Sequence, residues 1–199
     1  MNILKLSLSI ALSSTLLIAS GPMKKASKKD KELASVIKTG KRGSKMLLTT
    51  LGKNMKKRMK NGGVMKALDF CSNEAFTLTE GVNKKLPNGV RVKRISTKYR
   101  SPANKPTQNE QVVLDTFESM KKNNIILPPF LVEKVGSHTY KYYKPLVLNK
   151  KACLKCHGDI KDIDLKREIA SRYPLDNAMG YKMGDLRGAV VVTVDKTIK

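Results

Sequence analysis

The 199-residue chain has no tryptophan, only four phenylalanines and only two histidines. Its core is therefore poor in large aromatic side chains. The scarcity of histidine also limits the metal sites that the chain can build. A second Cys-x-x-Cys pair and a His-x-x-x-His pair are both missing, and a structural zinc site needs such a second pair of ligands. The chain also lacks an internal repeat and, after residue 21, any apolar segment long enough to span a bilayer.

The most informative stretch is Cys153-Leu154-Lys155-Cys156-His157, which has the spacing of a c-type haem attachment motif. Two thiols one helical turn apart can add to the two vinyl groups of one porphyrin, and His157 then offers a nitrogen to the iron as the proximal ligand. The alternatives are a thioredoxin-type thiol–disulfide couple and half of a zinc site. We expect one covalent haem c, held by Cys153, Cys156 and His157.

The first 21 residues predict a secretory signal. Lys5 supplies a positive charge, Leu6 to Ile18 form an apolar stretch, and Ala19-Ser20-Gly21 are small residues suited to cleavage. The apolar stretch is shorter than the about 20 residues of a permanent anchor, which is the lesser alternative. Export agrees with the haem motif, because c-type haem is attached outside the bacterial cytoplasm. We therefore expect a periplasmic protein with a signal at 1–21, a basic disordered leader at 22–32 and a single domain at 33–199.

Acidic residues are scarce: 16 Asp and Glu stand against 40 Lys and Arg, for a formal net charge of +24. More than half of this excess lies between Lys24 and Lys66, where the only acids are Asp30 and Glu32. Such a balance in a cytosolic protein indicates nucleic-acid binding, but export argues against it and no nucleic-acid recognition motif is present. We expect either a solvated lysine-rich helix face or attraction to an acidic redox partner or to anionic lipid head groups.

Apolar periodicity predicts an α+β architecture. Residues at three- and four-residue spacing indicate a broken helix or helical pair from Leu33 to Val82, interrupted at Asn61-Gly62-Gly63. A capping box of Thr107 and Glu110 predicts a helix that continues to about residue 120. Further patterns predict a helix at 165–171 and strands at 90–96, 130–135, 139–148 and 188–194. This order favours an antiparallel sheet with helices to one side.

Cys71 is the third and odd cysteine, on the apolar stripe of the second helical segment. In an exported protein such a cysteine indicates a reactive thiol, an intermolecular bridge or an inert core residue. Ferric iron would stabilise its thiolate, because coordination strongly lowers the pKa of a thiol. The competing candidates for the second axial position are Met179, Met183 and His138, although His138 follows a Gly-Ser turn and is expected at the surface. The residues alone leave the choice open.

From about Leu33 onward the chain resembles a family of exported single-haem c-type proteins with a PAS-like domain, found alone and as the sensor ectodomain of bacterial receptors. The segments that carry the resemblance are Tyr143-Lys144-Pro145-Leu146, Cys153 to Gly158, Tyr173-Pro174-Leu175-Asp176, Ala178, Gly180-Tyr181, Gly184-Asp185, Arg187-Gly188-Ala189, and Tyr99-Arg100 with Pro102, Asn104 and Pro106. Ser101 stands where the family often has asparagine. The resemblance implies a PAS-like antiparallel sheet, an N-terminal helical segment and a helix-borne cysteine as the distal iron ligand, which maps to Cys71.

Other residues of these segments have simpler interpretations. We expect the glycines at 180, 184 and 188 to permit tight turns and the aspartates at 176 and 185 to cap them. Arg100 and Arg187 carry planar forks that suit the propionates of a haem, and the alternative for both is surface charge.

Together these features predict a mono-haem c-type cytochrome that cycles between Fe(III) and Fe(II), in electron transfer or in redox sensing. The alternative is a gas-binding sensor module for NO or CO, and with no kinase region after Lys199 its signal would need a separate partner. We do not expect an enzyme such as a peroxidase, because that activity needs an open distal position beside a placed acid–base group.

Overall fold

The computed structural model describes residues 27–198. The predicted export signal at 1–21 and residues 22–26 of the predicted leader lie outside the described residues. Within residues 27–198, no helix combines the length and the apolar character that a bilayer crossing requires.

The N-terminal third is helical, as predicted. Helix α1 spans Lys28–Asn73 and helix α2 spans Ala75–Asn83. Ser27 caps α1 in a capping box with Asp30, so the helix begins ahead of Leu33 and includes residues that were expected in the leader. The backbone leaves helical geometry at Gly62 and Gly63, where Gly63 has a φ of 66°, and α1 kinks there. The predicted interruption of the helix is confirmed.

The remaining elements form an antiparallel sheet of four strands in the order β1-β4-β3-β2. The strands are β1 (Val90–Ile95), β2 (Leu131–Lys134), β3 (Thr139–Val147) and β4 (Leu186–Asp195); the helices after α2 are a 3₁₀ turn η1 (Pro102–Asn104), α3 (Gln108–Lys122), α4 (Lys151–His157) and α5 (Ile163–Arg172). The capping box of Thr107 and Glu110 starts α3 as predicted. The α+β class is confirmed.

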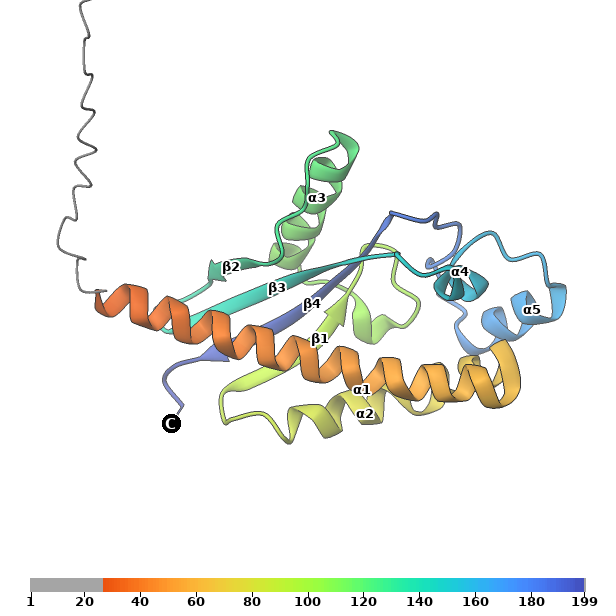
Figure 1. Cartoon of the computed structure of the whole chain (residues 1–199), viewed down its shortest axis with the longest axis horizontal. Coiled ribbons are helices and arrows are strands. Elements are labelled where there is room, and N and C mark those ends of the chain that lie inside the picture. The colour runs from red at the N-terminus through yellow and green to blue at the C-terminus, as the bar shows by residue number, and fades with distance from the viewer. Residues whose placement is uncertain (1–26, 199) are drawn as a thin grey trace, which may run out of the picture.

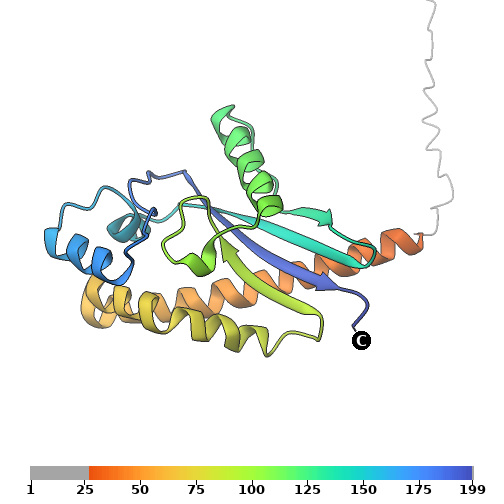
Figure 2. The same cartoon turned by 180° about the vertical axis from the view of Figure 1, so that it is seen from behind.

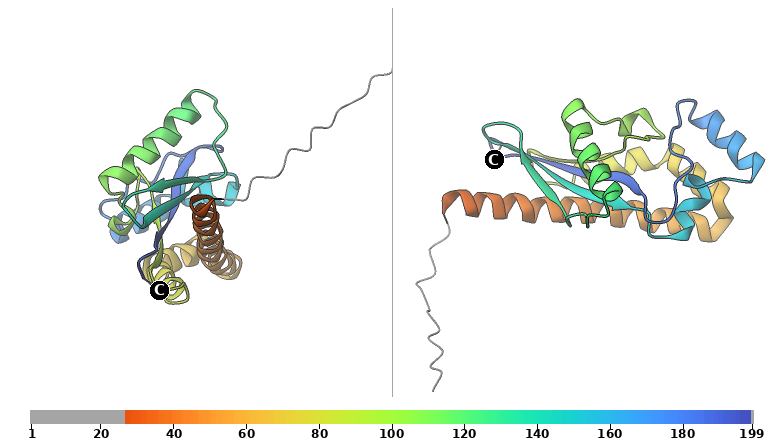
Figure 3. Two further views of the ribbon diagram at one scale, coloured as in Figure 1. Left: turned by 90° about the vertical axis from the view of Figure 1, so that its left-hand side faces the viewer. Right: turned by 90° about the horizontal axis from the view of Figure 1, so that it is seen from above.

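Helices cover both faces of the sheet, and the expectation that they lie to one side is wrong. Val190, Val192 and Val194 of β4 pack with α1 and α2, whereas Ala189 and Val191 pack with α3 on the opposite face. The views along and across the sheet show α1 and α3 on opposite sides of it (Figure 1, Figure 3). The physical reason is that β4 is apolar on both faces, so each face needs a cover.

Helix α1 lies close against β3. Gly40 sits directly over the ring of Tyr142, where a Cβ atom would overlap the ring carbons, so only glycine allows this approach. Tyr142 in turn stacks on Phe130, with the ring centroids 5.2 Å apart. The helix is thereby fixed along the length of the strand.

Helices α4 and α5 lie at one end of the sheet, beside the kinked end of α1 and opposite the C-terminus (Figure 1, Figure 2). Leu68 of α1 packs against Leu165 and Ile169 of α5 in a small apolar cluster. Arg172 of α5 forms an ion pair with Asp69 of α1. These contacts bring the part of α1 that carries Cys71 next to the haem motif.

Candidate haem site

The cysteines of the motif lie on helix α4. Cys153 and Cys156 are three residues apart, so they share one face of the helix, and both are half-buried free thiols. The helix follows β3 in an antiparallel sheet, and no parallel strand pair occurs among residues 27–198. The βαβ context of a thioredoxin-type couple is therefore missing from the described part of the chain.

His157 is held in one orientation. Its Nδ1 lies 2.8 Å from the carbonyl oxygen of Ala178. Because a carbonyl oxygen only accepts, Nδ1 carries the proton and Nε2 keeps a free lone pair. Burial, with a smaller effect of the Arg187 and Arg100 charges, lowers the pKa of His157 to about 3. The imidazole is thus neutral at physiological pH, as a metal ligand must be.

The tail that follows α5 fixes α4 in place. The backbone N–H groups of Gly180 and Tyr181 donate to the carbonyl oxygens of Gly158 and His157, at 3.1 and 2.9 Å. Asp176 Oδ1 accepts from the N–H of Ala178 at 2.7 Å. Three glycines of the tail, at 180, 184 and 188, have positive φ. The predicted turn-forming role of Gly180 and Gly184 and the capping role of Asp176 are confirmed, whereas Gly188 lies within β4, where its lack of a side chain allows the close approach of the Ile95 backbone.

Cys71 comes to this site from α1. Its side chain is exposed to solvent, unlike its buried neighbour Phe70, so it is not a core residue. Burial nevertheless raises the pKa of its thiol, and Arg94 and Arg100 offset part of that rise. Burial raises the pKa of the Cys156 thiol, and the nearby Cys71 adds to that rise.

The competing ligand candidates lie elsewhere or are otherwise engaged. His138 is exposed at the far end of β3, a strand of nine residues, which corresponds to about 30 Å from α4. The surface position expected for His138 is confirmed. Met183 is 46 % exposed, and Met179 packs with the apolar cluster around Leu68.

Three arginines surround the motif, and Arg100 is the most enclosed of them. It is 7 % exposed, its Nη2 donates to the carbonyl oxygen of Cys156 at 2.6 Å, and it lies 3.0 Å from a carboxylate oxygen of Asp176. Its Nε is buried without a hydrogen-bond partner among residues 27–198. The surface-charge interpretation of Arg100 is therefore wrong.

Arg187 and Arg94 complete the set. Arg187 Nη1 donates to Ser96 Oγ at 2.7 Å and to the carbonyl oxygen of Lys98 at 3.1 Å. Arg94 has neither a hydrogen bond nor an ion pair to any residue of the described chain. Sequence reasoning placed Arg94 on a strand, in line with Val90 and Val92, but gave it no role in the site. The available signal was the alternation of β1, because Arg94 continues the inward face of Val90 and Val92.

These residues fit a covalently attached haem. They offer two thiols on one helical face, a neutral oriented imidazole and a third thiol from another helix. Of the three guanidinium groups only that of Arg100 pairs with a carboxylate, that of Asp176, and partly buried cations without a carboxylate partner among residues 27–198 suit an anionic cofactor. No group of three or more His, Cys, Asp or Glu side chains in residues 27–198 could hold a bare metal ion. Haem iron needs only axial ligands from the protein.

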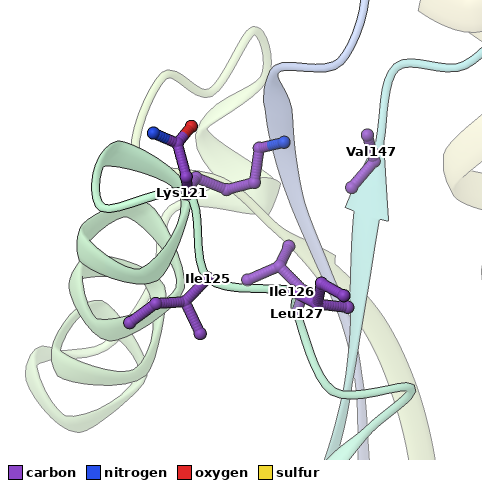
Figure 4. Close-up of a pocket in the computed structure, with 6 residues that line it drawn as sticks. Lys121, Ile125, Ile126, Leu127 and Val147 are labelled. Carbon is purple, nitrogen blue, oxygen red and sulfur yellow. The ribbon is translucent and has the colours of Figure 1, made fainter.

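Two hollows lie outside this site. One, of about 320 Å³, is bordered by Lys121, Asn124, Leu127 and Val147 between α3 and β3, with Ile125 and Ile126 beside it (Figure 4). The other, of about 390 Å³, lies between α1 and the β2–β3 hairpin and is lined in part by Lys41, Phe130 and Lys144. Neither contains a histidine or a cysteine, so neither offers a ligand for haem iron.

Comparison with known proteins agrees with this fold. The crystal structure of the cyanobacterial heme-protein Tll0287 superimposes with a TM-score of 0.58 at 20 % sequence identity, over 87 % of this chain and 99 % of that one. The antiparallel sheet with its long N-terminal helix is consistent with the predicted PAS-like fold. No curated protein matches the sequence. The sequence profile of the Tll0287-like family matches residues 22–195, and the chain belongs to that family.

Proposed function

We propose that the chain is an exported mono-haem c-type cytochrome that serves in electron transfer or redox sensing and not as an enzyme. Cys153 and Cys156 would attach the haem, and His157 and Cys71 would bind its iron. The observation that carries the proposal is the neutral His157, oriented by the Ala178 carbonyl, directly after two free thiols on one helical face. The solved relative, a heme-protein, supports the same cofactor.

When bound, haem supplies a one-electron couple between Fe(III) and Fe(II). The chain's own groups orient and tune it. The Ala178 carbonyl fixes the tautomer of His157 and makes its Nε2 a stronger electron-pair donor to a metal. A thiolate at Cys71 would favour Fe(III), because an anionic ligand stabilises the higher charge. Arg94 and Arg100 favour that thiolate over the thiol.

A periplasmic location is part of the proposal. Its support is the apolar stretch from Leu6 to Ile18 with its flanking charge and small residues. Covalent attachment at a Cys-x-x-Cys-His motif takes place outside the bacterial cytoplasm, so the motif and the N-terminal segment require each other.

A second candidate is a sensor of CO or NO. The observation in its favour is that burial raises the pKa of the Cys71 thiol. A Cys71 side chain that is not bound to a metal therefore takes up a proton at physiological pH, and a neutral thiol is a poor ligand. A protonated Cys71 would leave the distal side to a diatomic gas.

The test is the mass and spectrum of the mature protein. We expect the mass of the chain plus one haem, and haem that resists extraction with acidified acetone. Absorption spectra of the ferric, ferrous and CO-treated protein then separate the candidates, because an electron carrier keeps its spectrum under CO and a gas sensor does not. A mature chain without haem would contradict both.

A further inference from the structure

We propose that Arg94 and Arg187 form the binding site for the two propionate carboxylates of the haem, and that Arg100 instead positions helix α4. This inference rests on the proposed haem function and assigns a role to residues that the iron and thioether contacts leave without one.

Arg94 is half-buried and continues an apolar strand face. Side chains alternate along β1, and Val90 and Val92 on the same face pack beneath α1. Lys93, on the opposite face, reaches Glu110 of α3. Arg94 therefore points toward α1 and the Cys71 thiol, with no carboxylate to meet it among residues 27–198. A cation placed where the strand otherwise carries valine needs an anionic partner.

Arg187 is aimed at the same region by a β-bulge. Leu146 of β3 pairs with Gly188, and the next residue, Val147, pairs with Leu186, so Arg187 has no partner on β3. A bulge turns the extra side chain away from the normal alternation of the strand. The guanidinium lies 5.2 Å from the ring centre of Tyr181, whose edge meets His157. The sheet thus departs from regular pairing where it presents this cation.

Arg100 is already engaged. It binds the carbonyl oxygens of Cys156 and Ala178 and pairs with Asp176, so it links α4 to the tail that orients His157. Arg94 and Arg187 have no carboxylate partner in the described chain. Two uncompensated cations match the two carboxylates of one haem in number and sign.

The placement also suits the shape of a haem, whose propionates lie on the edge opposite its two vinyl groups. Arg100 lies at the thioether side, where its Nη2 donates to the carbonyl oxygen of Cys156. Arg187 donates instead to Ser96 and Lys98, and neither Arg187 nor Arg94 forms a hydrogen bond to α4 within residues 27–198. Burial lowers the pKa of Arg94 and of Arg187, as expected of enclosed cations without anionic partners.

The test compares variants that carry covalent haem. Arg94→Gln and Arg187→Gln each remove a positive charge near the iron, which disfavours the additional electron of Fe(II). We expect the ratio of Fe(III) to Fe(II) at a fixed applied potential to rise by about tenfold for a charge roughly 10 Å away. The propionate bending bands in the resonance Raman spectrum should shift as well. A merely structural arginine would leave those bands unchanged.

Arg91→Gln is the matched control. Arg91 lies on the same strand, is exposed and pairs with Glu80 at 3.0 Å, so its loss should change neither measurement. Arg94→Lys and Arg187→Lys keep the charge and serve where a glutamine variant fails to fold. With the planar fork lost, they should hold the potential near that of the wild type but still shift the Raman bands.

The outcomes are distinct. Wild-type potential and Raman bands in the haem-loaded variants at both positions would overturn the inference while leaving the haem function intact. A wild-type chain without covalent haem would refute the proposed function, and this inference with it.

Discussion

Two groups of charged side chains, one on each side of the sheet, differ in whether every charge has an oppositely charged partner. On the α3 face, the carboxylate of Glu110 is 1 % exposed and accepts hydrogen bonds from Lys93 at 2.8 Å and Lys141 at 2.9 Å. Near the haem motif, Arg100 pairs with the carboxylate of Asp176, whereas Arg94 and Arg187 have no carboxylate partner among residues 27–198. Lys93 and Arg94 are neighbours in β1, so one strand supplies a cation to each group.

The comparison separates a buried charge that the protein pairs internally from cations that it leaves without a carboxylate partner. Burial raises the pKa of Glu110, but hydrogen bonds from Lys93, the Thr107 backbone and Lys141 outweigh that effect, and the net pKa is lowered. The pKa of Arg94 and of Arg187 is instead lowered, chiefly by burial. The Glu110 group is complete within the protein. The arginine group has two cations without a carboxylate partner among residues 27–198, which the proposed haem propionates would supply.

The largest effect is expected from Cys71→Ala, which acts on the arginine side. If Cys71 binds the iron, the variant should keep its covalent haem but lose the wild-type ferric spectrum. Loss of an anionic ligand should raise the potential by roughly 100–300 mV, part of the about 0.8 V that axial ligands span. Spectroelectrochemical titration measures both changes.

Met179→Ala and Met183→Ala are the controls for that experiment. Met179 packs in an apolar cluster and Met183 is exposed, so both variants should keep the wild-type spectrum and potential. If a methionine variant loses them while Cys71→Ala retains them, the protein is an ordinary His/Met electron carrier.

A smaller effect is expected from Glu110→Gln, which removes the carboxylate charge that Lys93 and Lys141 share. This change leaves Lys141, only 17 % exposed, without a carboxylate. We expect a loss of about 2–4 kcal/mol in the free energy of unfolding, the order found when a buried ion pair loses one partner. Denaturant titration checks this, with Glu118→Gln on the same helix as a control that should change stability by less than about 0.5 kcal/mol.

The pH dependence of this difference has a defined sign. Because the pKa of Glu110 is lower in the folded than in the unfolded chain, its contribution is fully present above the unfolded value of about 4.3. It is lost as the pH falls through the lower folded value. The stability gap between the wild type and Glu110→Gln should therefore narrow in acid. A gap that stays constant as the pH falls below about 4 would argue against an ionised Glu110.

The smallest effect concerns cations that are neither buried nor paired. Helix α1 carries exposed basic side chains without an ion pair in the described chain, at Lys28, Lys29, Lys31, Lys38, Lys41, Arg42, Lys45, Lys53, Lys56, Lys57 and Lys60. If they attract an acidic redox protein, its rate of association should fall several-fold toward physiological salt, where the Debye length is about 8 Å. Stopped-flow measurement at increasing salt tests this.

A pair of double variants locates the effect. Lys56→Glu/Lys57→Glu should slow association, whereas Lys121→Glu/Lys122→Glu makes the same change in charge on α3, across the sheet, and should not. Equal effects would mean that net charge alone steers the partner. A rate independent of salt would leave only a solvated helix face. Binding to anionic but not neutral lipid vesicles would favour a membrane surface.

Local chemistry was predictable from the sequence and long-range placement was not. The Thr107–Glu110 capping box, the break at Gly62-Gly63 and the hairpin between β2 and β3 depend on neighbouring residues, and all three are confirmed. The position of α3 depends on which face of β4 it covers. Apolar runs such as Val190–Val194 do not reveal this, because the residues on both faces of the strand are apolar.

Within the candidate site, too, residues that are contiguous in the sequence were easier to predict than residues that come from other elements. Cys153, Cys156 and His157 form a contiguous motif and could be found from their spacing alone. Cys71 was singled out because it is the one cysteine outside the motif and because the family resemblance implies a helix-borne cysteine ligand. Its contact with the iron stays a prediction. Arg94 was given no role in the site because an arginine in a strand is usually solvated. The one sign that Arg94 points inward is that it continues the face of Val90 and Val92, and a single residue makes a weak pattern.

The kinked end of α1 has a consequence for folding. Contacts between α1 and α5, such as those of Leu68 with Ile169 and of Asp69 with Arg172, help to bring Cys71 to the neighbourhood of Cys156. These pairs are about a hundred residues apart in sequence, and such long-range contacts form late because a long loop must close first. The spacing of Cys153, Cys156 and His157 lies within five residues and does not depend on that closure. We therefore expect the placement of Cys71, and not the motif itself, to be the slow step in assembling the candidate site.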